Sequence, residues 1–364
     1  MTKLFLYIRA IFILPLIALL FRKKNTWLFS SWFGSKISDN SKYFYDDLND
    51  IDNNIFKVWI VKNKELHDSD KNIYYYLSIW GLYYQVVSSA VLCTHSLYSD
   101  FYPLAILLNR GIKVQLWHGT PLKKIMWDVP TTTLGSLKRK VFDRYDAVVC
   151  PNENFSHIYA RAFKVSKDKV IVSGCPRVRK NDSDVNSGKI LYAPTFRDDS
   201  SKCTLFDEYK FDIEKAESYL SEHNKVLYVR LHPRDTLDKK WEESINKSKY
   251  IHFDKSVDIY AELNTYDILI TDYSSIYFDF LPYDKPIVFA PFDLEKYEKK
   301  LRGTYFSYKD VTSGPYAYNW DDVLRILKNN EFELDKLRVL KDKYSQNIEI
   351  QSSQLIYEFI KGKM

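Results

Sequence analysis

The sequence predicts an α/β protein built from two domains of similar size. Its 364 residues exceed the usual length of one domain, which is roughly 150 residues. Short apolar runs alternate with longer stretches of helical periodicity, a pattern typical of parallel strands joined by crossover helices. The polar stretch 181–188 (NDSDVNSG) ends in glycine and interrupts this alternation. It is therefore the predicted linker between the domains.

Strands are expected at the short apolar runs of both domains. In the first domain, residues 25–180, these runs are 25–34, 55–61, 90–94, 111–118, 145–150 and 169–174, with helices at 72–89 and 101–109. In the second domain, residues 189–364, strands are expected at 189–194, 225–232, 250–253, 266–271 and 285–290. The charged tail 320–362 has helical periodicity.

Residues 1–24 form a separate hydrophobic segment. Its apolar run, 4–21, contains Arg9 and Pro15 and has basic residues at both ends. A helical membrane span needs about 20 apolar residues, and a charge inside the span is costly. We therefore expect a helix lying in the cytoplasmic membrane interface, with its cations on anionic headgroups. A single membrane span and a buried first helix of the globular fold are the alternatives.

The composition restricts the partners of the chain. The net charge of 53 − 47 = +6 permits a phosphate-rich or membrane partner. Nucleic acid is not an expected partner, because the sequence has no RNP or zinc-finger signature and no long basic run. Four scattered cysteines without CxxC spacing argue against a zinc ribbon or a disulfide framework and fit a reducing compartment.

Several common catalytic motifs are absent. The sequence lacks GxxxxGK[ST], GxGxxG after a strand, HExxH and GxSxG. These absences disfavour P-loop, dinucleotide-binding, zincin and serine-hydrolase chemistry. We see no acidic metal cluster, and the predicted function needs no metal and no cofactor.

In open parallel sheets, ligands bind beyond the carboxyl ends of the strands, so the residues that follow the strands are the candidates. The strand at 111–118 runs into the segment 118–124 (HGTPLKK). Thr120 suits a helix N-cap and Pro121 the first helical position, which places Lys123 and Lys124 in the first turn. Cations are unfavourable at a helix start unless an anion binds there. This segment is therefore a candidate phosphate site, although two solvated lysines and a core histidine would also fit.

Candidates also follow the strands of the second domain. Thr195 offers a hydroxyl and Arg197 a planar guanidinium suited to phosphate. Strand alternation would place Arg230 and His232 on one side of the sheet. After the strand at 266–271, two serines precede a helical stretch that can bind phosphate without a glycine-rich loop.

Taken together, these segments resemble the CDP-glycerol:poly(glycerophosphate) glycerophosphotransferases of teichoic acid synthesis, of the primase and polymerase type. The matching stretches cover residues 25–330 in the family's order: FGSKISDNSKYFYDDL, QLWHGTPLKKIMWD, GCPR, ILYAPTFRDD, LYVRLHP, ILITDYSSIYFDFLPYDKPIVF and RGTYFSY…GPY. The resemblance implies a GT-B fold, with two Rossmann-like domains facing across a cleft. The first domain would take the acceptor and the second the CDP-alcohol donor.

The resemblance also implies the reaction and its location. Glycerol phosphate would pass from CDP-glycerol to a hydroxyl of a lipid-linked saccharide or glycerophosphate acceptor, with release of CMP. The enzyme would be peripheral to the cytoplasmic face of the cell membrane, on an anionic surface, and would contribute to teichoic acid or capsular polymer synthesis.

Residue roles follow from the same resemblance. His118 would be the general base, and His232 would bind the pyrophosphate and steady or protonate the leaving CMP. Lys123 and Lys124 would contact phosphate or acceptor. Donor contacts are expected from Trp117, Gly119, Thr120, Pro121, Arg177, Pro194, Thr195, Arg197, Arg230, Leu231, Ser274, Ser275 and Asp279.

The sequence departs from the family pattern at two positions. Met126 stands where glycine is usual, and Arg179 where aspartate is usual. Three other functions remain open: a CDP-ribitol ribitolphosphotransferase, a GT-B glycosyltransferase using a nucleotide sugar, and a catalytically silent membrane scaffold. The intact His118, Arg230 and His232 argue against the scaffold. The released nucleotide separates the first two, since a CDP-alcohol gives CMP and most nucleotide sugars give a diphosphate.

Overall fold

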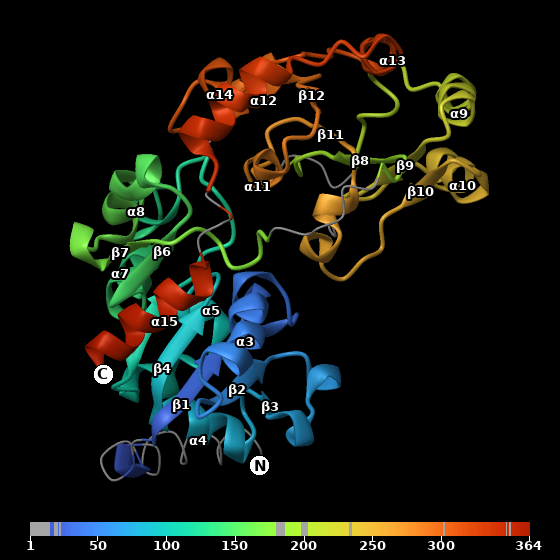
Figure 1. The fold of residues 1–364 in the computed structure, drawn as a ribbon. Helices are drawn as coiled ribbons and strands as arrows, with labels where there is room; N and C mark the ends of the chain where they lie inside the picture. Colours follow the sequence, from blue (N-terminus) through green and yellow to red (C-terminus); the bar gives the residue numbers. More distant parts are fainter. Residues whose placement is uncertain are drawn as a thin grey trace. The chain divides into compact units, whose positions relative to one another are not determined.

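The computed structural model describes residues 15–17, 21, 23–179, 186–197, 203–232, 235–300, 303–346, 348 and 351–364. The chain divides into two compact units. The first contains Met1–His118, Ile125–Arg179 and Gln346–Met364, and the second contains Gly119–Lys124 and Lys180–Ser345. Each unit has one parallel sheet (Figure 1).

The sheet of the first unit has seven parallel strands in the order β3-β2-β1-β4-β5-β6-β7. The order reverses direction between β1 and β4, where Trp27 pairs with Ala90 and Phe29 with Leu92. At such a point the connections that leave the two neighbouring strands run to opposite sides. α/β sheets bind their ligands there. The strands are Lys23–Phe29 (β1), Phe56–Val61 (β2), Ile73–Tyr75 (β3), Ser88–Cys93 (β4), Ile112–Gln115 (β5), Ala147–Cys150 (β6) and Val170–Val172 (β7).

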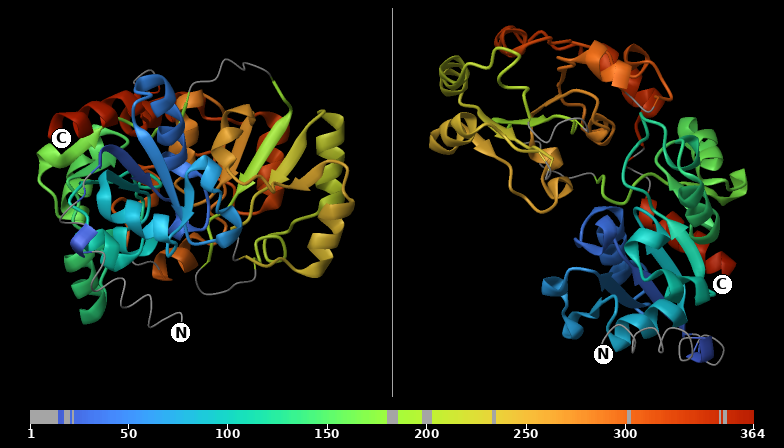
Figure 2. Two further views of the ribbon diagram at one scale, coloured as in Figure 1. Left: turned by 90° about the horizontal axis from the view of Figure 1, so that it is seen from below. Right: turned by 180° about the vertical axis from the view of Figure 1, so that it is seen from behind.

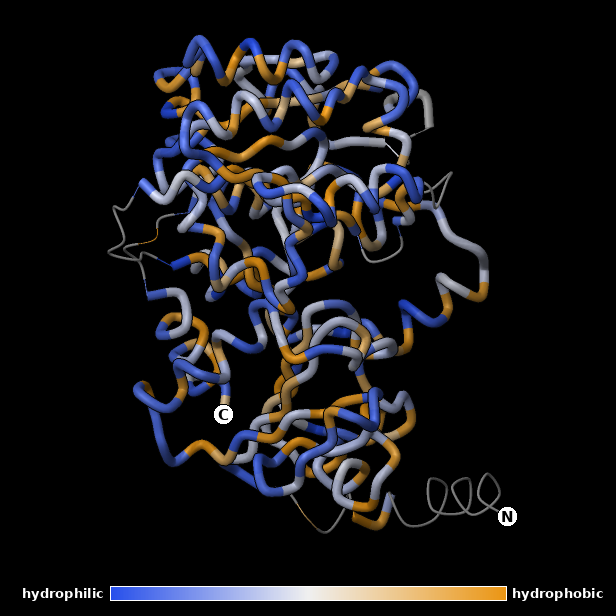
Figure 3. Tube along the Cα trace, turned by 90° about the vertical axis from the view of Figure 1, so that its right-hand side faces the viewer, coloured by the Kyte–Doolittle hydropathy of each residue, from blue (hydrophilic) through white to orange (hydrophobic). Residues whose placement is uncertain are grey.

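Helices cover this sheet and complete its core. Ser78 caps α4 by accepting from the Gly81 N–H at 3.0 Å, a common way of starting a helix. The apolar residues of the strands are almost all buried, and they alternate with hydrophilic segments along the trace (Figure 3). The main helices are Asp39–Ile51 (α3), Ile79–Val87 (α4), Leu97–Asp100 (α5), Pro103–Leu108 (α6), Thr133–Phe142 (α7), Ser156–Phe163 (α8) and Ser352–Lys363 (α15), with 3-10 turns at Trp32–Gly34 (η2), Lys64–Leu66 (η3), Ser69–Lys71 (η4), Met126–Asp128 (η5), Glu153–Phe155 (η6) and Lys167–Lys169 (η7).

The last helix, α15, belongs to the first unit. Ile356 and Ile360 are fully buried in the core beneath β1, and the Tyr357 hydroxyl donates to Asp52 at 2.8 Å. Both views of Figure 2 keep this red helix beside segments of the first unit. The predicted boundaries differ here, since they placed the whole stretch 189–364 in the second domain. Sequence periodicity identified the helix, but its packing partner is more than 300 residues away.

The sheet of the second unit has five parallel strands in the order β10-β9-β8-β11-β12, and it reverses between β8 and β11. Its core gathers apolar side chains from all five strands around Trp320, which is 2% exposed. The strands are Lys189–Ala193 (β8), Val226–Val229 (β9), Ile251–Phe253 (β10), Ile268–Thr271 (β11) and Ile287–Phe289 (β12). The helices are Ile213–Glu222 (α9), Lys239–Lys247 (α10), Ile276–Phe280 (α11), Leu294–Lys300 (α12), Trp320–Asn329 (α13) and Leu334–Tyr344 (α14), with 3-10 turns at Ile259–Ala261 (η8), Leu263–Thr265 (η9), Leu281–Tyr283 (η10) and Tyr308–Asp310 (η11).

Every predicted strand is present, but two stretches differ in type. The predicted helix at 72–89 is β3 followed by α4, because its first residues pair with β2. The predicted strand at 25–34 ends at Phe29 and continues into the turn η2. The alternation of strands and helices, which the sequence predicted, is confirmed in both units.

Most of the predicted membrane-associating segment, residues 1–24, lies outside the described residues, as does most of the predicted linker. Pro15–Ile17 have helical geometry. Among the residues that the structure describes, no helix combines the length and the apolar character that crossing a membrane requires.

Candidate active site

In the first unit, the predicted base follows β5, the strand next to β4, and β4 and β1 flank the reversal of the sheet. β4 is followed by Thr94 and His95, and β5 by Leu116, Trp117 and His118. The imidazole rings of His95 and His118 are stacked, with centroids 4.2 Å apart. The ring of the preceding residue, Trp117, has its centroid 4.1 Å from that of His118. The stacked pair of His95 and His118 therefore lies next to the point where the sheet topology predicts a ligand.

The contacts of His118 define its tautomer. Its Nδ1 lies 2.6 Å from the Thr94 carbonyl oxygen, which can only accept a hydrogen bond. Nδ1 therefore carries the proton, and Nε2 keeps its lone pair. Burial lowers the pKa of His118, and Arg177 lowers it further, while Asp39 and the hydrogen bond to Thr94 raise it. His118 is thus a neutral imidazole with a basic nitrogen, as a general base requires.

The neighbouring His95 and Asp100 have unusual pKa values. Burial lowers the pKa of His95 to about 2, and the repulsion that would arise if His95 and His118 were both protonated adds to this effect. Burial raises the pKa of the Asp100 carboxyl to about 7, although it accepts the N–H groups of His95 and Phe33 at 3.1 Å each. Rings of Trp32 and Phe33 pack against His95 at 5.1 and 4.2 Å.

Arg177 lies inside the first unit, where it is 1% exposed. Its Nη1 is 2.6 Å from Asp39 Oδ1, and its backbone N–H donates to Asn40 Oδ1 at 3.3 Å. Asn40 Nδ2 in turn donates to the carbonyls of Leu116 and Trp117 at 3.1 and 3.0 Å. Arg177 was predicted as a donor contact, and this geometry makes it a residue that positions the turn before His118.

Trp117 adopts a backbone conformation that bulky residues rarely accept. Its φ is 55°, in the left-handed region, and its side chain is 8% exposed. Such a conformation persists where surrounding contacts determine it, and here the Trp117 carbonyl is fixed by Asn40 and its N–H by Gln115 Oε1 at 2.9 Å. The turn that presents His118 is therefore held on both sides.

The segment after His118 is not the predicted helix start. Gly119–Lys124 belongs to the second unit and is not helical, with Lys123 in an isolated bridge to Thr304 and the Leu122 carbonyl accepting the Tyr305 N–H at 3.0 Å. These pairings satisfy backbone groups that a helix would have used. Thr120 and Pro121 are buried, Lys123 lies 5.1 Å over the Tyr297 ring, and Lys124 is exposed. The helix-terminus argument for a phosphate at these lysines is consequently wrong.

In the second unit, candidates again follow the strands that flank the reversal. Pro194 and Thr195 come after β8, and Asp272 and Ser274 after β11. The Thr195 N–H donates to Asp272 Oδ1 at 2.8 Å, which ties the two strand ends together. The Thr195 hydroxyl oxygen is buried and has no hydrogen-bond partner among the residues that the structure describes. A buried hydroxyl without a partner is rare, which makes it a candidate for binding a ligand.

Arg197 was predicted to bind phosphate, but its guanidinium is held by carboxylates. Nε donates to Asp293 Oδ2 at 2.8 Å, and Nη2 lies 2.7 Å from Asp293 Oδ1 and 2.8 Å from Asp272 Oδ2. The two carboxylates raise the pKa of Arg197 against the opposing effect of burial. Arg197 Cζ lies 5.2 Å from the rings of Tyr273 and Tyr297, which are stacked on each other with centroids 3.7 Å apart. Arg197 therefore holds the strand ends in place, and its charge is already neutralised.

The run Arg230-Leu231-His232 begins directly after β9 and is not part of the strand. Arg230 Nη1 contacts Asp254 Oδ2 at 2.5 Å and Ser256 Oγ at 2.9 Å, and the side chain is 23% exposed. His232 is partly exposed and packs its ring 4.8 Å from that of Phe196, while its backbone N–H donates to Asp235. Leu231 packs against the core of the unit.

The two serines lie before α11, which has only five residues. Ser274 and Ser275 are partly exposed, and the Ile276 N–H approaches Ser274 Oγ at 3.4 Å. Asp279 follows on the helix and is 2% exposed. The serines are thus accessible in the loop after β11, whereas Asp279 is buried within the unit.

Sequence reasoning missed His95, Asp39, Asn40, Asp100 and the acidic pair around Arg197. His95 directly follows a predicted strand, so the rule applied to the other strand ends would have found it. Asp39 and Asn40 lie in the stretch FGSKISDNSKYFYDDL, but their contacts are with residues far away in the sequence, Arg177 for Asp39 and the turn before His118 for Asn40. Within the described residues, no group of three or more His, Cys, Asp or Glu side chains has the geometry of a metal site, and all four cysteines are buried and free.

Comparisons with known proteins agree on one family. The model of the CDP-Glycerol:Poly(glycerophosphate) glycerophosphotransferase family matches residues 13–362. A teichoic acid glycerol-phosphate transferase of Staphylococcus aureus is 29% identical, over 93% of this chain and 93% of its own. A teichoic acid poly(glycerol phosphate) polymerase of Bacillus spizizenii is 30% identical, over 88% of each chain. A solved variant of the wall teichoic acid polymerase TagF has a TM-score of 0.76 at 24% identity, over 100% of this chain and 97% of its own, which shows a shared fold.

Proposed function

Because this chain belongs to the CDP-glycerol:poly(glycerophosphate) glycerophosphotransferase family, we propose that it transfers glycerol phosphate from CDP-glycerol to a hydroxyl acceptor and releases CMP. The single observation that carries the proposal beyond family membership is the state of His118. A neutral imidazole with its proton on Nδ1 stacks on His95, which follows β4 beside the topological switch point of the first unit, and its Nε2 is free to accept a proton.

The reaction balances as a phosphoryl-type displacement. The acceptor oxygen forms a bond to the phosphorus that carries glycerol, and the bond from that phosphorus to the bridging oxygen breaks. CMP leaves with the bridging oxygen and its electron pair, and the acceptor proton passes to His118 Nε2. General-base help of this kind is worth about 10²–10⁴-fold.

Residues of the second unit would bind the donor. Charge on the transferring and leaving phosphates needs stabilisation in the transition state. The unpartnered Thr195 hydroxyl, the partly exposed Ser274 and Ser275, Arg230 and His232 are the groups that support this role. Arg197 and Arg177, which are held by carboxylates, would keep the backbone of each site in place.

The acceptor and the location stay part of the proposal. We expect a lipid-linked saccharide or glycerophosphate acceptor and a peripheral enzyme at the cytoplasmic face of the membrane, in teichoic acid or capsular polymer synthesis. The basic flanks of the apolar run at 4–21 support membrane contact. The GT-B arrangement of the two units stays a prediction.

A product assay tests the donor and the reaction class together. Purified protein is incubated with detergent-solubilised lipid-linked acceptor and with CDP-glycerol, CDP-ribitol or a panel of nucleotide sugars, and released nucleotides are separated by chromatography. We expect CMP from CDP-glycerol. CMP from CDP-ribitol alone would change the donor alcohol, and a nucleoside diphosphate from a nucleotide sugar would overturn the reaction class.

A further inference from the structure

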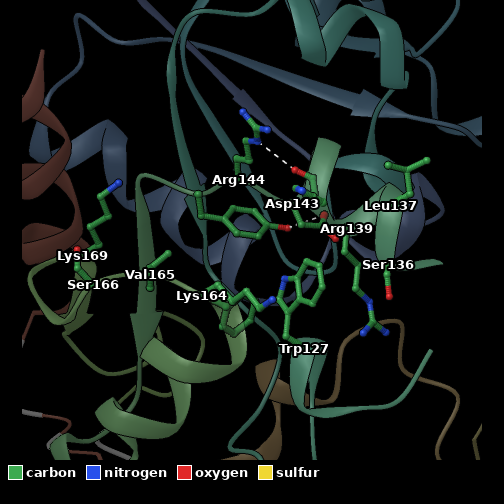
Figure 4. Close-up of a pocket in the computed structure, with 13 residues that line it drawn as sticks. Trp127, Ser136, Leu137, Arg139, Asp143, Arg144, Lys164, Val165, Ser166 and Lys169 are labelled. Atoms are coloured by element: carbon green, nitrogen blue, oxygen red, sulfur yellow. Dashed lines mark hydrogen bonds between the residues drawn. The ribbon is translucent and has the colours of Figure 1, made fainter. Parts of the chain in front are cut away.

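The first unit contains a large cavity that the proposed chemistry does not use. It has a volume of about 720 Å³ and lies between η5, α7 and the end of α8 (Figure 4). Five of its thirteen lining residues are cationic, and one, Asp143, is acidic. Aromatic rings of Trp127, Tyr145 and Phe163 form part of the wall. Convergent cations and aromatic faces in one concave site are typical of a pocket for an anionic organic ligand.

The lysines of the cavity are available for a ligand. Among the described residues, Lys140, Lys164 and Lys169 form no ion pair with a carboxylate. The Lys164 ammonium lies 3.6 Å over the Trp127 ring, and Figure 4 shows Lys164 beside Trp127, with Lys169 apart from them at the left of the view. A lysine held over an aromatic face provides charge at a fixed place without being neutralised.

Arg139, one of the lining residues, stabilises the wall of the cavity. Arg139 Nη1 donates to the carbonyls of Met126 and Val129 at 2.6 and 3.1 Å, which fixes the loop carrying Trp127. Asp143 accepts the Tyr145 hydroxyl at 3.2 Å, and burial raises the pKa of the Asp143 carboxyl to about 6. The one acidic residue of the lining is therefore held by the Tyr145 hydroxyl.

The helix at the rim exposes apolar side chains. α7 has no buried residue, and Leu134 and Leu137 are 62% and 56% exposed. Leu137 also lines the cavity. A rim with exposed leucines and a basic interior suits a ligand with an apolar tail and an anionic head.

Ring contacts connect the cavity wall to the candidate base. Phe163 lines the cavity and packs against Trp117 with ring centroids 5.1 Å apart, and Trp117 packs against His118. A ligand held in this cavity would thus lie two ring contacts from His118. No donor residue of the proposed reaction lines it.

We propose that this cavity binds the diphosphate-saccharide head of the lipid-linked acceptor, with Lys140, Lys164 and Lys169 on the phosphates and Trp127 against the sugar face. This inference rests on the proposed function. The head would anchor here while the growing end of the acceptor presents its hydroxyl at His118.

A binding measurement without donor tests the site. The probe is a short-chain alkyl diphosphate disaccharide in neutral detergent, titrated by calorimetry into the full chain. The test variant is Lys164→Gln with Lys169→Gln. The matched control is Lys138→Gln with Lys167→Gln, which makes the same charge change at nearby positions outside the cavity. Hydrogen bonds to charged groups predict a weakening of about 10- to 100-fold for the test variant only.

Kinetics and vesicle binding distinguish an acceptor site from a structural effect and from a site for bulk lipid. We expect the test variant to raise KM for the probe and to leave KM for CDP-glycerol unchanged, with thermal unfolding matching that of the control. Unchanged probe binding, or equal weakening in both double variants, would overturn the proposal. So would a loss of binding to phosphatidylglycerol vesicles with probe binding intact, because the cavity would then serve bulk lipid.

A second variant tests the proposed contact between Trp127 and the sugar. Trp127→Leu should weaken binding of the disaccharide probe by a larger factor than binding of the alkyl diphosphate without sugar, because it removes the sugar contact as well as the ring over which Lys164 lies. Equal effects on both would contradict a sugar contact. If the wild-type chain binds the probe but releases no CMP from CDP-glycerol, the proposed function fails while the cavity assignment to an anionic saccharide stands.

Discussion

The imidazole of His118 stacks on that of His95, with ring centroids 4.2 Å apart and planes 8° apart. Two stacked imidazolium cations would repel each other in a poorly hydrated site, so both rings are neutral near pH 7. The stack and the hydrogen bond to Thr94 leave His118 one orientation, with Nε2 as its basic atom. In the proposed mechanism, this relationship orients the base before the acceptor binds.

The acid limb of the pH–rate profile should lie below the ordinary histidine value. Burial lowers the pKa of His118 from 6.5, so the base stays neutral and active into more acidic solution. We expect kcat/KM for wild-type protein to fall with an apparent pKa below 6.5. The exposed-histidine variant His157→Ala should keep this limb. An acid limb above 6.5 would contradict the burial argument.

The stability of the first unit should show two opposing pH dependences. His95 has a folded-state pKa of about 2 against 6.5 unfolded, so its contribution is present above pH 6.5 and is lost as pH falls. Asp100 has a folded-state pKa of about 7 against 3.8, so its contribution is present at low pH and is lost as pH rises. Between about pH 4 and 6.5 the two nearly cancel.

Two single variants separate the pH dependence due to His95 from that due to Asp100. Relative to wild type, the free energy of unfolding of His95→Gln should fall as pH rises from about 4.5 to 6.5, and that of Asp100→Asn should rise. Each slope is at most about 1.4 kcal/mol per pH unit. Urea unfolding across this range measures both, and parallel slopes in the two variants would contradict the assignment.

Asn40 should be essential for positioning the base. Asn40→Ala removes the partners of the Leu116 and Trp117 carbonyls, which costs about 1–3 kcal/mol of stability and releases the turn before His118. Since a displacement of about 1 Å can cost about 100-fold in rate, we expect kcat to fall by about 10- to 100-fold with little change in KM for CDP-glycerol. Asn49→Ala, a position on the outer face of the same helix, is the control. Equal kinetics in the two variants would contradict the role.

Replacing Arg197 should affect the stability of the second unit more than the binding of the donor phosphates. Arg197→Ala leaves Asp272 and Asp293 buried without their cation, which should destabilise the second unit by about 3–5 kcal/mol. Arg197→Lys should not restore it, because lysine lacks the planar fork that joins both carboxylates. Arg325→Ala, where the pair is half-exposed, should cost about 1 kcal/mol or less. Urea midpoints of the three variants provide the check.

The sequence predicted most of the fold and part of the site, for a physical reason. Strand periodicity and the residues after strand ends are local features, and they correctly located His118, Thr195 and the serine pair at strand ends. Three expectations were wrong or incomplete. They are the helix after Pro121, the free charge on Arg197, and the place of α15 in the second domain. In each case a partner distant in sequence decides: the strand pairing with Thr304, the carboxylates of Asp272 and Asp293, and the core around Trp27.

The most direct test of the proposed mechanism is the rate of CMP release from CDP-glycerol by His118→Ala, measured beside wild type and His157→Ala with the same acceptor. We expect wild type and His157→Ala to release CMP at similar rates and His118→Ala to be slower by about 10²–10⁴-fold, with unchanged thermal unfolding. Wild-type turnover by a folded His118→Ala protein would show that another group takes the acceptor proton.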